Sequence, residues 1–229
     1  TPITCTANAT AVINTTGGWG TNSFTVTGPS PATTTVTQSN KTFTNLTAGD
    51  YIGAVTDMNG CTDSIPFTIA PVVAIVASID PSSDYCYVSP AGATIVATPG
   101  ATVDATNYMY SINGGTPQAS GTFSGLIPGS YIITVSDTST KCSLPLPAVT
   151  IASPISASTK LIKDLDCTTT TSANATIEVT ISNGYAPYEY QVRYNSGAYT
   201  SYAPITSPFT YSATVAGVYD FQIKDSKGC

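Results

Sequence analysis

Six cysteines recur at a fixed interval, and this periodicity constrains the chain more than any other sequence feature. The first, third and fifth are 81 residues apart, as are the second and fourth; the six are Cys5, Cys61, Cys86, Cys142, Cys167 and Cys229. Such an interval is too long for a solenoid unit and suits a small autonomous domain. We therefore predict three tandem repeats at residues 1–70, 71–153 and 154–229, the first incomplete at its N-terminal end and the third at its C-terminal end.

The composition indicates an all-β protein that works outside the cell. Charged residues make up only 9% of the chain, there is no histidine, and the net charge is −6. The seven basic residues form no stripe, so we expect neither nucleic acid nor an anionic membrane as a partner. No apolar run is long enough to insert into a membrane. An even number of cysteines in such a chain indicates an oxidising, extracellular setting.

A shared motif precedes the second cysteine of every repeat. It consists of a glycine, a tyrosine two residues later, an aspartate six residues beyond the tyrosine, and then the cysteine. Its residues are Gly49, Tyr51, Asp57 and Cys61, then Gly129, Tyr131, Asp137 and Cys142, then Gly217, Tyr219, Asp225 and Cys229. The glycine fits a turn, and the alternation after the tyrosine predicts a half-buried strand. The aspartate is predicted to open an Asx turn that ends at the cysteine.

Further strands are predicted from blocks that recur between the repeats. Alternating or β-branched segments occur at residues 9–12, 24–26, 65–69, 93–96, 108–110, 148–151, 175–179 and 188–190. Asn113 and Gly114 predict a two-residue hairpin turn. Six or seven short strands in each repeat, with regular turn signals, are typical of an Ig-like antiparallel β-sandwich. The predicted fold is therefore all-β, with three such sandwiches in tandem.

Two regular disulfide pairings fit the cysteine pattern. Pairing within repeats joins Cys5 to Cys61, Cys86 to Cys142 and Cys167 to Cys229, which uses all six. Pairing across the linkers joins Cys61 to Cys86 and Cys142 to Cys167, which leaves two unpaired. We favour one disulfide within each repeat, because a domain this small often needs a covalent link to stabilise a thin core.

The motifs resemble the SprB repeat family of Bacteroidota cell-surface and gliding adhesins. The third repeat has the family's Gly-x-x-Pro-Tyr-x-Tyr segment as Gly184 to Tyr190, and the first two repeats match the Leu-x-x-Gly-x-Tyr…Asp…Cys segment. Thr214 replaces the family's Leu in the third repeat, and Lys141 replaces the Gly before Cys142. The resemblance implies export by the type IX route, a stalk, filament or adhesin on the cell surface, and no catalytic residues.

No residue pattern predicts an enzyme, a metal centre or a cofactor site. A Ser-His-Asp triad requires histidine, no glycine-rich phosphate loop follows a strand, and no Cys-x-x-Cys occurs. The segment that begins Asp57-Met-Asn-Gly is a weak calcium candidate, but it lacks the terminal glutamate of an EF-hand, and an Asx turn is the simpler interpretation. We therefore predict no catalytic, cofactor-binding or metal-ligating residue.

Two kinds of surface site are candidates. Ser64 lies in Asp-Ser-Ile, which resembles the O-glycosylation site of Bacteroidota surface proteins. Tyr194, Tyr199 and Tyr202 lie in a hairpin region and are candidates for stacking on a sugar. The expected partners are neighbouring repeats of the same chain, surface glycans or other copies of the chain. The alternatives to a stalk are a carbohydrate-binding accessory region of a secreted enzyme, or a fibre subunit that exchanges edge strands.

Overall fold

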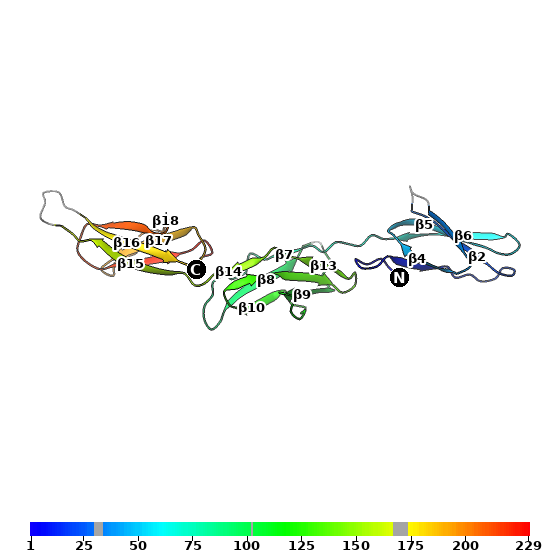
Figure 1. Cartoon of the computed structure of the whole chain (residues 1–229), viewed down its shortest axis with the longest axis horizontal. Helices are drawn as coiled ribbons and strands as arrows, with labels where there is room; N and C mark the ends of the chain where they lie inside the picture. Colours follow the sequence, from blue (N-terminus) through cyan, green and yellow to red (C-terminus); the bar gives the residue numbers. More distant parts are fainter. Residues whose placement is uncertain (30–33, 102, 167–173) are drawn as a thin grey trace. The chain divides into compact units, whose positions relative to one another are not determined.

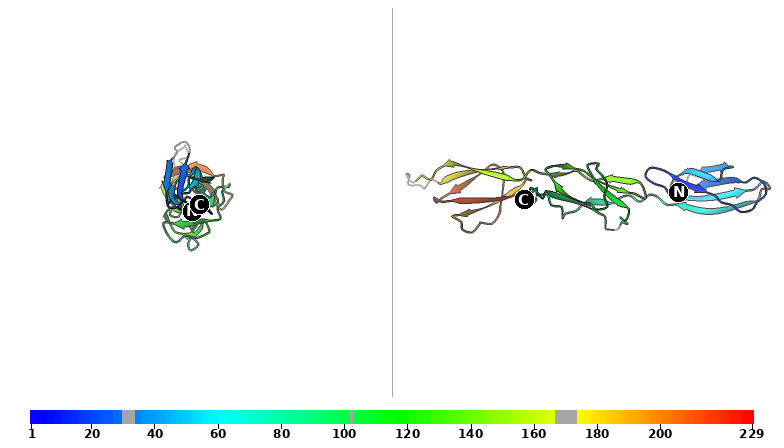
Figure 2. Two further views of the ribbon diagram at one scale, coloured as in Figure 1. Left: turned by 90° about the vertical axis from the view of Figure 1, so that its right-hand side faces the viewer. Right: turned by 90° about the horizontal axis from the view of Figure 1, so that it is seen from below.

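The chain consists of β-strands joined by loops and turns (Figure 1, Figure 2). The computed structural model describes residues 1–29, 34–101, 103–166 and 174–229, and within these ranges it contains no helix. Every strand pairing in the described residues is antiparallel. The predicted all-β, antiparallel fold class is confirmed. Over the same ranges, no helix has the length and apolar character that a membrane span requires.

The chain divides into two compact units, each built from several segments. The first comprises Thr1–Ser78, Pro99–Ser120 and Ile133–Leu146, and the second comprises Ile79–Thr98, Gly121–Ile132 and Pro147–Cys229. The sequence boundaries at 70 and 153 do not coincide with this division, and the three-repeat organisation stays a prediction of the sequence. We use "repeat" below for the three sequence ranges.

The described residues of the first unit form three sheets. Its strands are β1 (Ala9–Val12), β2 (Ser23–Gly28), β3 (Thr34–Gln38), β4 (Thr42–Leu46), β5 (Gly49–Thr56), β6 (Thr62–Ile69), β9 (Tyr108–Ile112), β12 (Ile133–Asp137) and β13 (Cys142–Pro145). They form the sheets β1-β4, β3-β2-β5-β6 and β13-β12-β9. The alternation of β2 is that of a half-buried strand, because Phe24 and Val26 turn inward while their neighbours are more exposed.

The core of the first repeat lies between β1-β4 and the four-stranded sheet. Phe24, Val26, Phe43 and Tyr51 are buried together, with Phe67 and other apolar side chains packed around them. The rings of Tyr51 and Phe67 stack with centroids 5.3 Å apart. Since Phe43 comes from β4 and the other buried side chains come from β2 and β5, the two sheets form a sandwich.

In the second unit, the part of the chain that the structure describes forms four sheets. Its strands are β7 (Ala77–Ile79, at the boundary with the first unit), β8 (Ala93–Pro99), β10 (Thr122–Leu126), β11 (Gly129–Tyr131), β14 (Val149–Ile151), β15 (Ser156–Lys163), β16 (Ala175–Ser182), β17 (Tyr188–Tyr194), β18 (Ala203–Ile205), β19 (Phe209–Ala213) and β20 (Tyr219–Lys224). They form the sheets β10-β8-β7, β11-β14, β15-β16-β19 and β18-β17-β20. Aromatic rings connect the sheets β15-β16-β19 and β18-β17-β20. The ring centroid of Tyr190 in β17 lies 4.7 Å from that of Phe209 in β19.

A tyrosine hydrogen bond recurs at the same motif position in all three repeats. The hydroxyl groups of Tyr51, Tyr131 and Tyr219 donate to the carbonyl oxygens of Thr47, Ile127 and Val215, at 2.9, 2.8 and 2.9 Å. Each acceptor lies four residues before its tyrosine. This arrangement resembles the tyrosine corner of Ig-like sandwiches, and it fixes the start of the strand that leads to the second cysteine.

Candidate functional site

The second cysteine of each repeat ends a turn that begins at the shared aspartate. We call these segments, residues 57–61, 137–142 and 225–229, the cysteine turns. In the first, Oδ1 of Asp57 accepts hydrogen bonds from the backbone N–H groups of Asn59 and Cys61 at 2.9 and 3.0 Å. In the third, Oδ1 of Asp225 accepts from Lys227 and Cys229 at the same two distances. The predicted Asx turn is confirmed.

The second carboxylate oxygen of two of these aspartates accepts a backbone N–H from another loop. Trp19 donates to Oδ2 of Asp57 at 3.2 Å, and Tyr185 donates to Oδ2 of Asp225 at 3.0 Å. Hydrogen bonds from backbone N–H groups hold the pKa of Asp57 below its usual range. The bond from the Cys61 N–H has the largest effect, and the bond from the Trp19 N–H lowers the pKa further. The carboxylates therefore act as structural acceptors that orient the turn.

The pKa of Asp137 in the middle cysteine turn is also depressed. Burial of this carboxyl raises its pKa, but hydrogen bonds from the hydroxyl and N–H groups of Ser139 and Thr140 outweigh burial. The residue before each cysteine has a positive φ: 81° at Gly60, 56° at Lys141 and 87° at Gly228. Lys141 thus adopts the left-handed conformation that glycine adopts in the other two turns.

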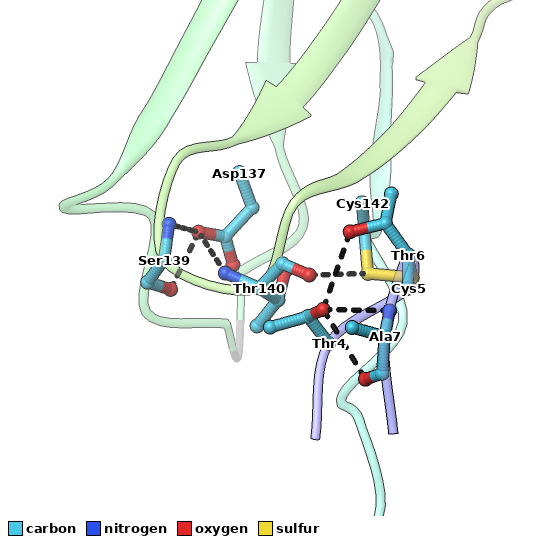
Figure 3. Close-up of a disulfide and its surroundings, with 8 residues drawn as sticks. All are labelled: Thr4, Cys5, Thr6, Ala7, Asp137, Ser139, Thr140 and Cys142. Atoms are coloured by element: carbon cyan, nitrogen blue, oxygen red, sulfur yellow. Dashed lines mark hydrogen bonds between the residues drawn. A yellow bond between two sulfur atoms is a disulfide. The ribbon is translucent and has the colours of Figure 1, made fainter. Parts of the chain in front are cut away.

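The disulfides join successive repeats, and the predicted pairing within repeats is wrong. Cys5 is bonded to Cys142 and Cys86 to Cys229, with Cα–Cα distances of 5.0 and 5.3 Å. Figure 3 shows the first of these bonds between residues 4–7 and the cysteine turn of Asp137. Both disulfides obey one rule, in which the first cysteine of a repeat bonds the second cysteine of the next repeat. The alternative pairing across linkers is excluded as well. It requires Cys86 to bond Cys61 and Cys142 to bond Cys167, but both cysteines are bonded to other partners.

Local backbone contacts explain this pairing. The N–H of Cys5 donates to the carbonyl oxygen of Thr140 at 2.8 Å, which places the segment before β1 against the cysteine turn of the following repeat. Chain entropy opposes this pairing only slightly, since each doubling of a loop adds about 0.6 kcal/mol to the cost of closing it. Closing loops of 137 and 143 residues therefore costs only slightly more chain entropy than closing the shorter loops predicted within repeats.

The second disulfide is surrounded by aromatic contacts that the sequence did not single out. The ring of Tyr185 meets the ring of Tyr85 edge-on, with centroids 6.3 Å apart. The ammonium group of Lys227 lies 4.3 Å from the centre of the Tyr85 ring. The hydroxyl of Tyr185 accepts the N–H of Ala152 at 2.7 Å and donates to the carbonyl of Thr150 at 2.8 Å. Burial raises the pKa of Tyr185, so the hydroxyl stays protonated and able to donate.

Two cysteines are left outside these bonds. Cys61 is free and exposed, contrary to its predicted bond with Cys5. Cys167 lies outside the described residues, and its predicted bond with Cys229 is excluded because Cys229 is bonded to Cys86. Two disulfides of this kind indicate folding in an oxidising compartment.

The three tyrosines that were candidates for sugar contact have different neighbours. Tyr194, Tyr199 and Tyr202 are 40%, 38% and 36% exposed. The guanidinium of Arg193 lies 4.8 Å from the centre of the Tyr199 ring, and the ammonium of Lys224 lies 4.1 Å from that of Tyr202. One face of each of these two rings therefore carries a cation.

Tyr194 makes a different set of contacts. Its ring packs against Tyr219 at 5.3 Å, and its hydroxyl donates to the carbonyl of Ala216 at 2.9 Å. The structure thus gives the three tyrosines separate partners and does not show them gathered into one platform.

Ser64 lies on β6, opposite Ala54 of β5, with its side chain exposed. Its backbone N–H donates to the Asp63 carboxylate at 2.8 Å. Across the described ranges, no three His, Cys, Asp or Glu side chains gather as metal ligands.

Comparison with known proteins finds a distant likeness to solved structures. No protein-family model and no curated protein sequence matches the chain. A solved structure, the dimeric latent PorU of Porphyromonas gingivalis, aligns over 91% of this chain at 12% identity and a TM-score of 0.16. The chain spans 27% of the length of that protein. A likeness this weak supports no argument about function.

The aromatic residue that contacts the cysteine turn was not predicted from the sequence. Trp19 and Tyr185 each follow a glycine, in Gly18-Trp19 and Gly184-Tyr185, and each donates its N–H to the aspartate of its turn. The Gly-aromatic pair was therefore a usable signal. The middle repeat lacks this pair, because Asn107 occupies the position of the aromatic residue. The carbonyl oxygen of Asn107 accepts the N–H of Thr138 at 3.0 Å.

Proposed function

We propose that the chain is a structural and adhesive segment of a long, secreted, cell-surface repeat protein, in the manner of a stalk, filament or adhesin. The observation that supports this most strongly is the disulfide rule, since both bonds tie one repeat to the next. A bond within a repeat would stabilise that repeat alone. Bonds between repeats resist their separation, which is what a surface protein under tension requires.

The chemistry of the repeats supports the same proposal. The aspartates of the cysteine turns are engaged by backbone N–H groups and serve as structural acceptors. In the chain-entropy model, a disulfide that closes a loop this long stabilises the folded chain by about 5 kcal/mol. The resemblance of the motifs to SprB repeats supports export by the type IX route and display on a Bacteroidota cell.

The intact mass and flanking peptides of the native polypeptide test this proposal. A mass many times the 23.5 kDa of this chain, with flanks that repeat the Gly-x-Tyr…Asp…Cys motif, is the expected result. A modest mass with an unrelated flank rich in histidine or paired carboxylates would overturn it and favour an accessory region of a secreted enzyme.

Glycan contact by the third repeat is a second candidate function. It is favoured by Tyr199 and Tyr202, whose exposed rings each lie beside a basic side chain. A glycan array with the whole chain and with Tyr199→Ala tests this. Binding that the substitution abolishes supports it, and equal binding by both proteins contradicts it. Tyr87→Ala serves as the matched control, because Tyr87 lies in the second repeat.

A further inference from the structure

One residue lies beside the cysteine turn of every repeat, and we call it the flanking residue. Its carbonyl oxygen accepts the backbone N–H of the residue that follows the aspartate of the turn. The three pairs, flanking residue first, are Trp19 and Met58 at 3.1 Å, Asn107 and Thr138 at 3.0 Å, and Tyr185 and Ser226 at 2.9 Å. The flanking residues therefore occupy equivalent positions in the three repeats.

In the third repeat, the flanking residue contacts the segment that brings the bonded cysteine. Cys229 is bonded to Cys86, the first cysteine of the repeat before, and Tyr85 directly precedes Cys86. The ring of Tyr185 meets that of Tyr85 edge-on, with centroids 6.3 Å apart. The Lys227 ammonium lies 4.3 Å from the centre of the Tyr85 ring. The aromatic residue before the bonded cysteine is thus held by the flanking residue and by the turn.

The middle repeat has no aromatic residue at either of these two positions. Its flanking residue is Asn107, and Thr4 directly precedes the bonded Cys5. The Thr4 hydroxyl accepts the N–H of Ala7 at 3.0 Å, within its own segment (Figure 3). In both bonded turns, the flanking residue and the residue before the bonded cysteine therefore match in kind. One pair is aromatic and the other is polar.

The first repeat has a cysteine turn of the same geometry with a free cysteine. The N–H of Asp57 donates to the carbonyl of Cys61 at 3.0 Å, as the N–H of Asp225 does to that of Cys229. Cys142 and Cys229 are bonded, but their counterpart Cys61 is free and exposed. The first repeat thus carries the turn that receives a cysteine in the other two repeats.

The flanking residue of this open turn is aromatic. Trp19 donates its N–H to the Asp57 carboxylate at 3.2 Å, as Tyr185 does to that of Asp225 at 3.0 Å. These bonds hold the backbone of Trp19 against the turn, while its side chain is exposed and the whole residue is 73% accessible. The open turn therefore matches the third repeat, whose flanking residue is also aromatic, and differs from the middle repeat.

We propose that Trp19 and the cysteine turn of the first repeat form an attachment site for the first-cysteine segment of a preceding repeat, in which an aromatic residue directly precedes the cysteine. The inference rests on the proposed function, because a preceding repeat belongs to the longer polypeptide proposed there. Both disulfides join a second cysteine to the first cysteine of the repeat before, which assigns the bond to Cys61. Contact between two aromatic rings supplies the selectivity, as Tyr85 and Tyr185 show.

The bond forms by thiol–disulfide exchange, with a small disulfide such as oxidised glutathione as the oxidant. The cysteine of the preceding repeat first exchanges with it, forms a mixed disulfide and releases one glutathione. The Cys61 thiol loses its proton, and the thiolate attacks the cysteine sulfur of the mixed disulfide. The new bond to Cys61 forms as the mixed disulfide breaks. The second glutathione leaves with the electron pair and takes up a proton.

A peptide that copies residues 82–89 tests the selectivity, because it carries Tyr85 directly before Cys86. This peptide and its Tyr85→Thr version compete at equal concentration for the unsubstituted chain in a glutathione redox buffer. Peptide mapping without reduction counts the adducts at Cys61. The parent peptide is expected to exceed the Tyr85→Thr peptide by about tenfold. A Tyr87→Thr peptide is the matched control and is expected to compete as well as the parent.

Substitutions of Trp19 test whether its ring is the cause. Trp19→Asn introduces the flanking residue of the middle repeat, and it is expected to abolish the preference for the parent peptide. Trp19→Phe keeps a ring and is expected to retain most of the preference. Val218→Ala is the matched control in the chain, because Val218 is 63% exposed and lies in the third repeat.

The fluorescence of Trp19 reports the ring contact separately from bond formation. Trp19 is the single tryptophan of the chain, so its emission is expected to shift to shorter wavelength when the parent peptide is attached. The Tyr85→Thr peptide is expected to shift it less, although it forms the same bond to Cys61. In the native polypeptide, mapping without reduction is expected to join Cys61 to a cysteine that directly follows Phe, Tyr or Trp.

Three results would overturn the inference. One is equal capture of the parent and Tyr85→Thr peptides, since an exposed thiol alone gives that result without any change to the chain. Another is a preference that persists in the Trp19→Asn chain. The third is a long native polypeptide in which Cys61 is free or is bonded to a cysteine after a non-aromatic residue. That last result would leave the proposed function standing, because the intact mass and flanking peptides judge it separately.

Discussion

The hydroxyl oxygen of Tyr185 accepts the backbone N–H of Ala152 at 2.7 Å. The two residues lie in the third and second sequence repeats, so this bond joins the repeats beside the Cys86–Cys229 disulfide. We expect Tyr185→Phe to lower the free energy of unfolding by about 1–3 kcal/mol, because it leaves the Ala152 N–H and the Thr150 carbonyl without this partner.

Urea unfolding of the oxidised chain measures this loss. Tyr188→Phe is the matched control, since the Tyr188 hydroxyl donates to the carbonyl of Asn183 within the same repeat. A Tyr185→Phe chain as stable as the parent would show that the hydroxyl does not hold the two repeats together.

Acid is expected to loosen the first cysteine turn. The pKa of Asp57 is lowered in the folded chain, chiefly by the Cys61 N–H. The stabilising effect of its carboxylate is therefore complete above the unfolded pKa of about 3.9, and it is lost as the pH falls through the lower folded value. Trp19 donates to this carboxylate, so its fluorescence should change with a midpoint below about 3.9.

Asp57→Asn should abolish this transition, and Asp137→Asn should leave it in place because Asp137 belongs to another turn. A midpoint at or above the ordinary aspartate pKa would contradict the assignment of the backbone N–H groups as the cause.

Lys141→Gly is expected to stabilise the chain. Lys141 has a φ of 56°, in the left-handed region where a side chain costs roughly 1–2 kcal/mol relative to glycine. Glycine loses more backbone entropy on folding, so the expected net gain in the free energy of unfolding is about 0.5–1 kcal/mol.

Lys141→Ala separates the backbone effect from the side-chain effect. It removes the hydrogen bond from the Lys141 ammonium to the Thr138 carbonyl but keeps a Cβ at positive φ. Thermal and chemical unfolding of both variants measure the difference. An alanine variant that gains as much as the glycine variant would exclude relief of backbone strain.

The covalent path through the two disulfides sets how far the chain extends under force. Force that enters at Thr1 crosses from Cys5 to Cys142, runs back along the backbone to Cys86 and leaves through Cys229. The fully unfolded oxidised chain should therefore reach roughly 200 Å, against about 800 Å after reduction.

Single-molecule pulling between the termini, with and without a reductant, measures both lengths. A chain with Cys5→Ser and Cys142→Ser keeps one disulfide and should reach about 300 Å. An oxidised chain that extends fully would mean that the disulfides do not form in solution.

Much of the local structure was readable from the sequence, because it depends on residues close together in the chain. The Asx turn at Asp57 needs only the N–H groups that follow it, and Asn113 and Gly114 both adopt the positive φ expected of the hairpin turn. The strand after Tyr51 follows from its alternation. These features are decided within a few residues and do not depend on how repeats meet.

The disulfide partners could not be read in the same way. The cysteine spacing reveals a repeat, but pairing within a repeat and pairing with the next repeat produce the same spacing. The choice depends on the contact between Cys5 and Thr140, which lie far apart in the sequence. The ring contact that Tyr185 makes likewise depends on Tyr85, and no local sequence pattern predicts that contact.

The loops closed by the two disulfides overlap, since Cys86 and Cys142 both lie inside the loop of the other bond. A protease that cuts the backbone once, anywhere between Cys5 and Cys229, leaves two fragments that are still joined by at least one disulfide. Pairing within repeats would have left the linkers unprotected, and a single cut there would have released everything beyond it. Because the bonds overlap, a protease must cut the backbone between Cys5 and Cys229 at least twice before a fragment of this segment is released.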